Sequence, residues 1–171
     1  TVGYSEARKS PLWAAFRLDS RTPFPTGLRP TKFLVDGRSD ARAQPRDYNR
    51  AGFDRGHLAP NAGIRNCFGP EAQLETFLMT NIMAQKPELN RKLWLRMEEK
   101  QEDYARLFGP IWIFCGPVFD SEKETLEAGE EIPDACYKII IDESGDQVRV
   151  LSFLVPQDVS GNEYFGGFLT S

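Results

Sequence analysis

Long apolar stretches are missing from this sequence, and so is a recognisable leader. No segment approaches the roughly 18 uninterrupted apolar residues that a membrane-spanning helix needs, because the longest apolar runs, Ile111–Cys115 and Val150–Val155, are of strand length. The polar segment Thr1–Lys9 lacks the apolar centre of a signal peptide. We therefore expect no membrane segment and a single domain over residues 1–171, since this length suits one hydrophobic core rather than two.

Cysteine and histidine are scarce. The three cysteines, Cys67, Cys115 and Cys136, form no CxxC pair, which argues against a disulfide framework and against a structural zinc site. One disulfide with a spare thiol stays open, and Cys115, in the apolar run IWIFC, is expected in the core. His57 is the one histidine, so any chemistry that needs an imidazole depends on it.

Positive charge is in deficit overall but concentrated in one segment. The net charge is −4, yet the segment from Arg17 to Arg65 has ten Lys and Arg and five Asp, which leaves +5 there and −9 elsewhere. Arginine suits bidentate phosphate contacts, so we interpret the segment as a phosphate-facing surface, with a solvated loop as the alternative. Its basic residues are Arg17, Arg21, Arg29, Lys32, Arg38, Arg42, Arg46, Arg50, Arg55 and Arg65.

The expected strands indicate an antiparallel sheet. Apolar segments predict strands at 13–19, at 111–119 (buried on both faces), at 135–142 and at 148–155, with a shorter strand at 32–36. The last two long strands are expected to pair through the turn at 143–146.

The clearest helix runs from about Asn90 to Phe108. Leu93, Met97, Tyr104 and Leu107 recur there at helical spacing, and Gly109-Pro110 ends it. Another short helix is expected within 70–80, ending in a buried segment. Strands on one side and a loop and helix on the other predict an α+β fold.

The long polar segment 37–61 contains the best motif, NRAGFDRGHLAPN at Asn49–Asn61. Phosphodiester hydrolysis needs a base to deprotonate water and a cation to hold the phosphate. His57 and Arg55 suit these roles, and in an extended segment they point to one side while Asp54 points to the other. Gly56 permits backbone conformations that larger residues avoid. The alternative is that a lone loop histidine is structural or merely exposed.

A second cluster lies downstream, where Asn81 and Asn90 precede Glu98. Asn90 stands where the predicted helix begins, so it is either an N-cap or a hard oxygen ligand for Mg²⁺. Glu98 is rotated from it by about 80° on the helix, which favours an acceptor for metal-bound water over a second ligand. The alternative is a solvated acid on a charged helix face.

The DRGH run at 54–57, followed by TNIMAQKPELNRKLWLRME from Thr80 to Glu98, closely resembles the DNA/RNA non-specific endonucleases with a ββα-metal site. The similarity extends from about Trp13 to Gln157, because WAAFRLD, FGPIWIFCGPVFD, IPDACYKIII and FLVP resemble framework strands of that family. The resemblance implies a ββα-metal site in the α+β fold. It also implies hydrolysis of DNA and RNA with little sequence preference, giving 5′-phosphate ends.

The resemblance also implies a role for each matching residue. His57 matches the general base, Asn90 the single protein ligand of a Mg²⁺ (or Mn²⁺) ion, and Arg55 the phosphate-binding arginine of the motif. Asp54 matches a structural, hydrogen-bonding aspartate, Asn81 an asparagine that supports the site, and Glu98 the acid that orients metal-bound water. Arg29, in TGLRP, is a weaker match to an upstream phosphate-contacting arginine.

Two departures from the family pattern qualify the resemblance. Glu102 stands where the family has an arginine four residues after Glu98, which removes one phosphate contact. The chain also ends at Ser171 without the family's final elements, so we expect a domain truncated at its C-terminus.

Partners and compartment follow from the resemblance alone. DNA and RNA are the expected partners, while a homodimer and a protein inhibitor are left open. A secreted or periplasmic protein is expected from bacterial relatives, and a mitochondrial one in a eukaryote. The competing hypotheses are a non-catalytic nucleic-acid-binding protein of the same fold and a nuclease effector acting with a cognate inhibitor.

Overall fold

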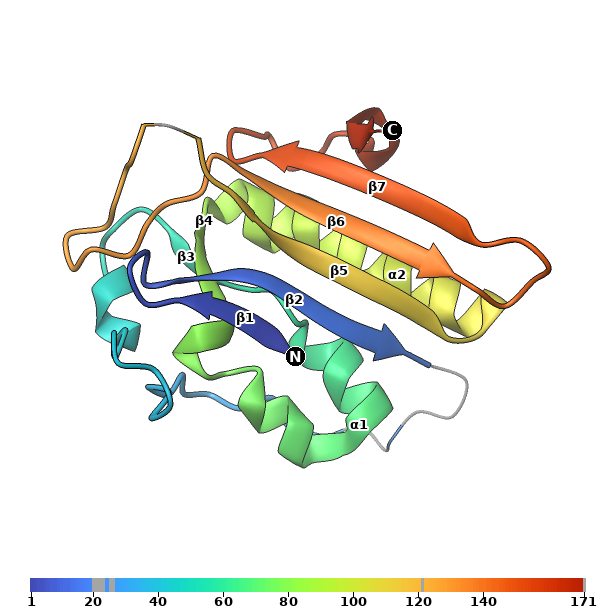
Figure 1. Ribbon diagram of the computed structural model, residues 1–171, viewed down its shortest axis with the longest axis horizontal. Helices are drawn as coiled ribbons and strands as arrows, with labels where there is room; N and C mark the ends of the chain where they lie inside the picture. Colours follow the sequence, from blue (N-terminus) through green and yellow to red (C-terminus); the bar gives the residue numbers. More distant parts are fainter. Residues whose placement is uncertain (20–23, 25–26, 121, 171) are drawn as a thin grey trace.

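The computed structural model describes residues 1–19, 24, 27–120 and 122–170. Arg21 and Ser171, named above, lie outside these residues. The main element is a six-stranded antiparallel sheet in the order β1-β2-β5-β6-β7-β8 (Figure 1). Its strands are β1 (Val2–Ser5), β2 (Ser10–Leu18), β5 (Ile111–Val118), β6 (Ala135–Asp142), β7 (Arg149–Pro156) and β8 (Leu169–Thr170).

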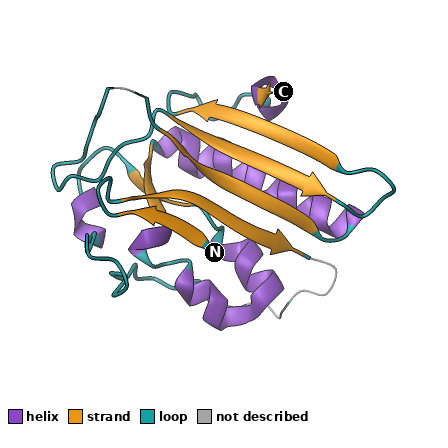
Figure 2. Ribbon diagram, viewed as in Figure 1, coloured by secondary structure: helices purple, strands orange, loops and turns teal. Residues whose placement is uncertain are grey.

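A two-stranded ribbon and the helices complete the fold (Figure 2). The ribbon pairs β3 (Asp54–His57) with β4 (Ile82–Gln85). The helical elements are η1 (Pro45–Tyr48), α1 (Asn61–Glu75), η2 (Met79–Asn81), the π-helix η3 (Leu89–Trp94), α2 (Leu95–Phe108) and η4 (Phe165–Phe168). The expected α+β fold is confirmed, as are the strands at 13–19, 135–142 and 148–155 and the helix at 90–108.

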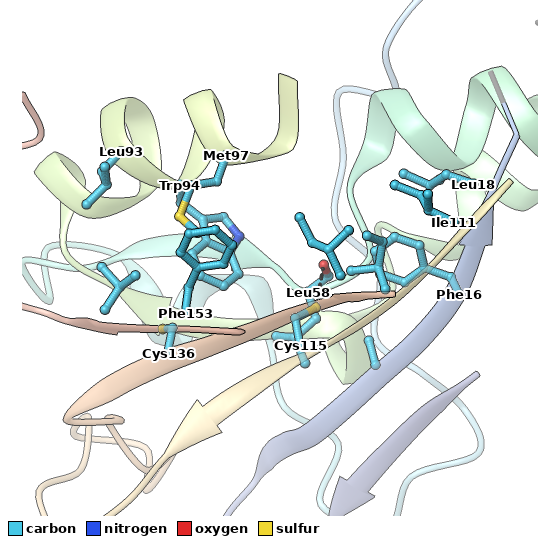
Figure 3. Packing of buried hydrophobic residues seen from close by; sticks show 14 of the residues in the cluster. Phe16, Leu18, Leu58, Leu93, Trp94, Met97, Ile111, Cys115, Cys136 and Phe153 are labelled. Atoms are coloured by element: carbon cyan, nitrogen blue, oxygen red, sulfur yellow. Dashed lines mark hydrogen bonds between the residues drawn. The ribbon is translucent and has the colours of Figure 1, made fainter. Parts of the chain in front are cut away.

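The main core lies between the sheet and the continuous helix η3–α2, which runs along one sheet face (Figures 1 and 3). Trp94 and Met97 from the helix meet Cys115, Cys136 and Phe153 from three strands. Cys115 is fully buried, as expected, and burial raises its pKa to about 12. None of the three cysteines, all of which are described, is in a disulfide, so the disulfide left open above does not form.

Strand β5 alternates between the core and solvent, so the expectation that it is buried on both faces is wrong. Ile111, Ile113 and Cys115 are buried, while Trp112 and Phe114 are 38% and 37% exposed. The aromatic side chains of the outer face made the strand look continuously apolar, although only one face has a helix packed on it.

The helix expected within 70–80 begins earlier than predicted. α1 covers Asn61–Glu75 and kinks at Gly69, which has a φ of 87°. Gly69-Pro70 resembles a terminator in sequence, but glycine accepts the positive φ and Pro70 suits the first turn of the resumed helix. The predicted buried segment after it is confirmed by Phe77 and Met79. The shorter strand expected at 32–36 is reduced to a single bridge between Leu34 and Leu78.

Across the described residues, the structure has no helix long and apolar enough to span a membrane.

Candidate functional site

The two sequence clusters meet in a ββα arrangement. In the ribbon, Asp54 pairs with Gln85 and His57 pairs with Ile82, and the helix leading into α2 starts at Pro87. The DRGH run is therefore a strand rather than an irregular loop. The paired strand β4 is followed directly in the chain by the helix that carries Asn90 and Glu98.

Gly56 is required by close packing and not by an unusual backbone. It lies in strand β3, and an added Cβ would overlap the side-chain amide of Gln85 from β4. Gln85 is fully buried, with its Nε2 3.6 Å from Cys136 Sγ. The sequence suggested that Gly56 is needed for an unusual backbone conformation. In the structure it is needed because a side chain at this position would collide with Gln85.

His57 is buried in a cluster of three rings that it forms with Phe33 and Phe77. The ring centroids of Phe33 and Phe77 lie 5.4 and 5.0 Å from that of the imidazole. Nε2 is buried without a hydrogen-bond partner among the described residues. Burial, with a smaller contribution from the positive charge of Arg29, lowers the pKa of His57 to about 3. The imidazole is therefore neutral at physiological pH.

Arg55 lies on the same side of β3 as His57, as the extended conformation predicts. Its guanidinium is 5.1 Å from the ring centre of Phe33, the ring that also packs on His57. Nη1 donates to the carbonyl of Pro45 at 2.5 Å and to Asn49 Oδ1 at 3.4 Å. These contacts leave Nε and Nη2 without a described hydrogen bond, so the side chain keeps donors for a phosphate.

Asp54 points to the other side of β3 and anchors the start of the helix. It accepts hydrogen bonds from Asn90 Nδ2 at 3.0 Å and from Arg91 Nε and Nη2 at 2.7 and 2.6 Å. Although burial opposes ionisation, the contacts with Arg91 and Asn90 leave the pKa of Asp54 below its usual value. Asp54 therefore stays charged and fixes which end of the Asn90 amide faces away from it.

The N-cap interpretation of Asn90 is wrong. The helical segment begins at Pro87, and the backbone N–H of Asn90 donates to the carbonyl of Lys86 at 2.9 Å. Asn90 thus lies inside the π-helix η3. This helix type is rare overall, and where it occurs it is often found at functional sites.

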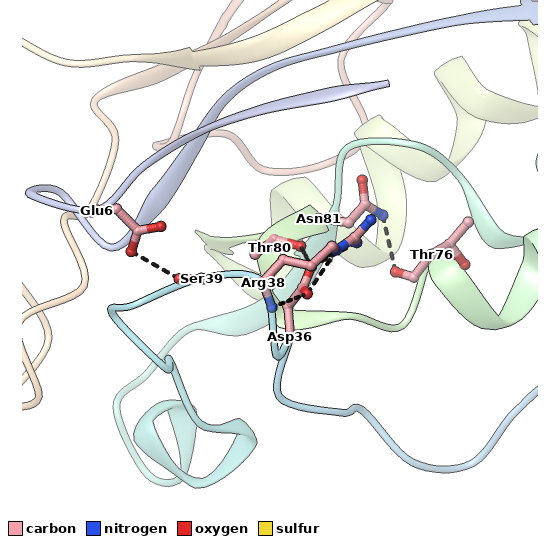
Figure 4. Close-up of polar contacts among 7 residues, drawn as sticks. All are labelled: Glu6, Asp36, Arg38, Ser39, Thr76, Thr80 and Asn81. Atoms are coloured by element: carbon pink, nitrogen blue, oxygen red, sulfur yellow. Dashed lines mark hydrogen bonds and ion pairs between the residues drawn. The ribbon is translucent and has the colours of Figure 1, made fainter.

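Asn81 supports the site from behind. Its Oδ1 accepts from the backbone N–H of Ala59 at 3.0 Å, and its Nδ2 donates to the carbonyls of Ala59 and Thr76 at 3.0 and 2.9 Å (Figure 4 shows the Thr76 contact). Both the oxygen and the nitrogen of this buried side-chain amide are therefore hydrogen-bonded to the backbone. It joins the segment after β3 to the segment before β4.

Glu98 is half-buried, which does not fit the alternative of a fully solvated acid. Burial raises its pKa to about 7, and Lys138 and Arg29 act in the opposite direction. Glu102, one turn further on, accepts a hydrogen bond from Asn66 Nδ2 at 2.9 Å. The acid that replaces the family arginine is therefore tied to α1.

Arg29 is brought to the site from a distant loop. Its guanidinium is 5.5 Å from the ring centre of Phe77, and its charge acts on both His57 and Glu98. The structure thus places the weakest sequence match beside two of the strongest.

Four further residues of the site were not predicted. Phe33 and Phe77 enclose His57, Arg91 holds Asp54, and Lys138 lies near Glu98. The role of Arg91 could have been predicted, because it is next to Asn90 in the sequence and the acid Asp54 needs a positively charged partner. The two phenylalanines gave none, since apolar residues outside a periodic pattern do not reveal what they cover.

The donor atoms suit a hard divalent cation. No three His, Cys, Asp or Glu side chains gather as a metal cluster in the described part of the chain. A site built on one amide oxygen and water needs no such cluster. Because Asn90 Nδ2 is held by Asp54, Oδ1 is left as a hard oxygen donor.

Comparisons with known proteins agree with this arrangement. The family model for "DNA/RNA non-specific endonuclease" matches residues 1–165. The mitochondrial nuclease EXOG of Xenopus laevis is 31% identical over 95% of this chain and 50% of its own length. A nuclease of a Nostoc species is 28% identical over 99% of this chain and 65% of its own length.

A solved structure shares the fold. It is described as the EndoG/EndoGI complex and the mechanism of EndoG inhibition, and it matches with a TM-score of 0.88 and 22% identity over 99% of this chain and 76% of that chain. The chain spans about half the length of the EXOG proteins that it matches. Since the family model covers almost the whole sequence, the chain belongs to the DNA/RNA non-specific endonuclease family.

Proposed function

We propose that this chain carries the catalytic site of a divalent-metal-dependent endonuclease that hydrolyses phosphodiester bonds in DNA and RNA. The observation that carries the proposal is the ββα arrangement, in which strand β3 carries a neutral, buried His57 and Asp54 of the same strand orients Asn90 on the adjoining helix η3. A base and a hard oxygen ligand are the two groups that hydrolysis of a phosphodiester requires from this fold.

His57 is the proposed general base. Its Nε2 is unpaired among the described residues, so this ring nitrogen is available for a proton from the attacking water. Burial and Arg29 make the imidazole a weak base in the free protein, and the negative charge of a bound phosphate would raise its pKa towards neutrality. Phe33 and Phe77 fix the ring, and a fixed base needs little reorganisation when the proton moves.

The remaining residues hold substrate and cation. Arg55 and Arg29 are proposed to bind non-bridging phosphate oxygens with their permanently charged guanidinium groups. Asn90 Oδ1 is proposed to hold Mg²⁺ or Mn²⁺, and Glu98 to orient water close to it. When bound, the cation would neutralise negative charge that develops on the phosphate during hydrolysis.

The substrate range and partners follow from the family. A site that binds backbone phosphate carries no information on base sequence, so we propose low sequence preference and 5′-phosphate products. A structural neighbour is described in complex with EndoGI and in terms of EndoG inhibition, and we propose that a protein inhibitor can act on this chain as well. The mitochondrial names of several relatives favour that organelle in a eukaryotic source, with secretion or the periplasm in a bacterial one.

A plasmid assay tests the proposed activity. The protein should nick and linearise supercoiled plasmid in Mg²⁺, degrade RNA as well, and stop when a chelator is added. The variant His57→Ala should retain the circular dichroism spectrum and lose about 100- to 10,000-fold in rate. A fully active His57→Ala, or full activity in chelator, would remove the proposed mechanism.

Asn90→Ala tests the metal ligand separately. We expect the Mg²⁺ concentration for half-maximal activity to rise by at least about tenfold, because the one protein oxygen proposed to hold the ion is lost. Asn162→Ala, which removes the same amide from an exposed loop, is the matched control and should leave the Mg²⁺ dependence unchanged. Equal behaviour of the two variants would contradict the role of Asn90.

A further inference from the structure

Lys138 is a buried lysine that the proposed chemistry does not use. It lies in the middle of β6 and its residue surface is 0% exposed. Burial lowers its pKa, while the nearby acid Glu98 opposes this effect. A cation in such a place is costly unless neighbouring groups compensate for its lost hydration, so its partners define what it does.

The partners of Lys138 come from one face of the helix. Its Nζ donates to Gln101 Oε1 at 3.0 Å and lies 4.3 Å from the ring centre of Trp94. Glu98 is four residues after Trp94 and three before Gln101, and side chains at these spacings share a helix face. The contacts with Trp94 and Gln101 therefore place the ammonium group below the helical turn that carries Glu98.

This face of the helix is rich in donors and poor in acceptors. Trp94 Nε1 and Gln101 Nε2 are buried without hydrogen-bond partners in the described part of the chain. Together with the ammonium of Lys138 they are donors suited to an anion, and Glu98 is the acid on the same helix face.

Charges from β6, from the loop of Arg29 and from α2 itself act on Glu98. Lys138 from β6 and Arg29 from its loop favour the carboxylate, while Glu99 and Glu102 on α2 oppose it. Cys115 from β5 and Cys136 from β6 also face Lys138, and burial raises the pKa of both thiols, so they stay neutral. The largest favourable charge on Glu98 is Lys138.

We propose that Lys138 is a positioning residue for the nuclease reaction, and that its buried positive charge keeps Glu98 in the carboxylate form at the site. Lys138 itself is enclosed between sheet and helix, so it does not touch nucleic acid. It acts through Glu98 and should affect turnover, not substrate binding. This inference rests on the proposed function for its link to turnover, but the electrostatic influence of Lys138 on Glu98 can be tested without any activity.

The first experiment measures Glu98 in the metal-free protein. The carboxyl carbon of Glu98 is followed by NMR from pH 4 to pH 9, with Glu98→Gln used to assign the signal. In Lys138→Met the midpoint should rise by about one pH unit or more, because a nearby positive charge is lost. Lys100→Met removes the same charge from the partly exposed face of α2 and should not move the midpoint. An unchanged midpoint in Lys138→Met would overturn the proposal.

Lys138→Met removes one partner of a buried cluster, so it is expected to lower stability, and its fold is checked by circular dichroism first. If it does not fold, Gln101→Leu provides a second variant, because it keeps the lysine and removes the acceptor that holds Nζ. We expect Gln101→Leu to move the Glu98 midpoint in the same direction by a smaller amount. No movement in a folded Gln101→Leu would count against the proposal.

Kinetics test the link to catalysis. At pH 7, Lys138→Met should lower kcat by about five- to tenfold with KM unchanged, and Lys138→Arg should restore part of the loss. In a Glu98→Gln background the same substitution should have less than about a twofold effect, because coupled residues are not additive. Equal losses in both backgrounds would overturn the proposal. A protein without any nuclease activity would contradict the proposed function, while the NMR titration would still decide the role of Lys138.

Discussion

The neutral state of His57 makes the stability of the protein depend on pH. Its pKa falls from 6.5 to about 3 on folding because the ring is buried, so the unfolded chain binds the proton that the folded chain excludes. Stability contributed by this residue is therefore lost as pH falls from about 6.5 towards 3, with a slope of up to about 1.4 kcal/mol per pH unit. His57→Gln should lack that slope, so the difference in the free energy of unfolding between the two proteins should change with pH between about 6.5 and 3, measured by urea denaturation at several pH values. Parallel curves for the two proteins would contradict the burial of a neutral imidazole.

Glu98 is expected to oppose stability while it serves function. Its pKa rises to about 7 in the folded protein, mainly through burial, so the folded state binds a proton more tightly than the unfolded state. This contribution is present below about pH 4.5 and is lost as pH rises through 7. Glu98→Gln should therefore raise the free energy of unfolding at pH 8 by about 1 to 3 kcal/mol and lower the rate of DNA cleavage.

The exposed neighbour Glu99 supplies the control for Glu98. Glu99→Gln removes the same charge one residue further along α2 and should change stability by less than about 0.5 kcal/mol. A stabilisation of Glu99→Gln equal to that of Glu98→Gln would mean that general charge relief on the acidic helix, and not burial of Glu98, is the cause.

At the scale of elements, the ribbon β3–β4 depends on the absence of a side chain at Gly56. An added methyl group would overlap the amide of the buried Gln85 on the neighbouring strand. Gly56→Ala should therefore lower the free energy of unfolding by about 1 to 3 kcal/mol through overpacking. Because the obstacle is one side chain, Gln85→Ala should recover part of this loss in the double variant, as measured by thermal denaturation. Simple additivity of the two losses would show that the clash does not limit the ribbon.

The elements that could be predicted from the sequence are those whose pattern is local. The paired strands β6 and β7 follow from β-rich segments around a turn, and α2 from its helical periodicity. Leu107 was wrongly placed on the core face and is 72% exposed. Ten residues separate it from Met97, and this rotates it by about 80° from the buried stripe.

The site was predictable only in part for a related reason. His57, Asn90 and Glu98 stand in short motifs whose residue types carry the chemistry. The enclosure of His57 needs Phe33 and Phe77 from segments far from β3, and the environment of Glu98 needs Lys138 from β6. Such contacts depend on how the sheet, ribbon and helix pack, and no single stretch of sequence specifies them.

At the scale of the whole molecule, the uneven charge predicts how DNA binding responds to salt. The segment 17–65 carries +5 in a chain with a net charge of −4, and it supplies Arg29 and Arg55, whose guanidinium groups lie over the rings that enclose His57. Each phosphate contact releases counterions, so log Kd should vary linearly with the logarithm of the salt concentration. Removal of one contact should lower that slope by about one. We expect this for Arg29→Ala and for Arg55→Ala, each measured in the His57→Ala background so that the DNA stays intact.

Arg106→Ala provides the matched control, because that arginine is paired with Asp103 on α2, outside the basic segment. A slope that falls equally for Arg106→Ala would mean that overall charge governs binding, and an unchanged slope for Arg29→Ala and Arg55→Ala would remove both residues from the phosphate-binding surface.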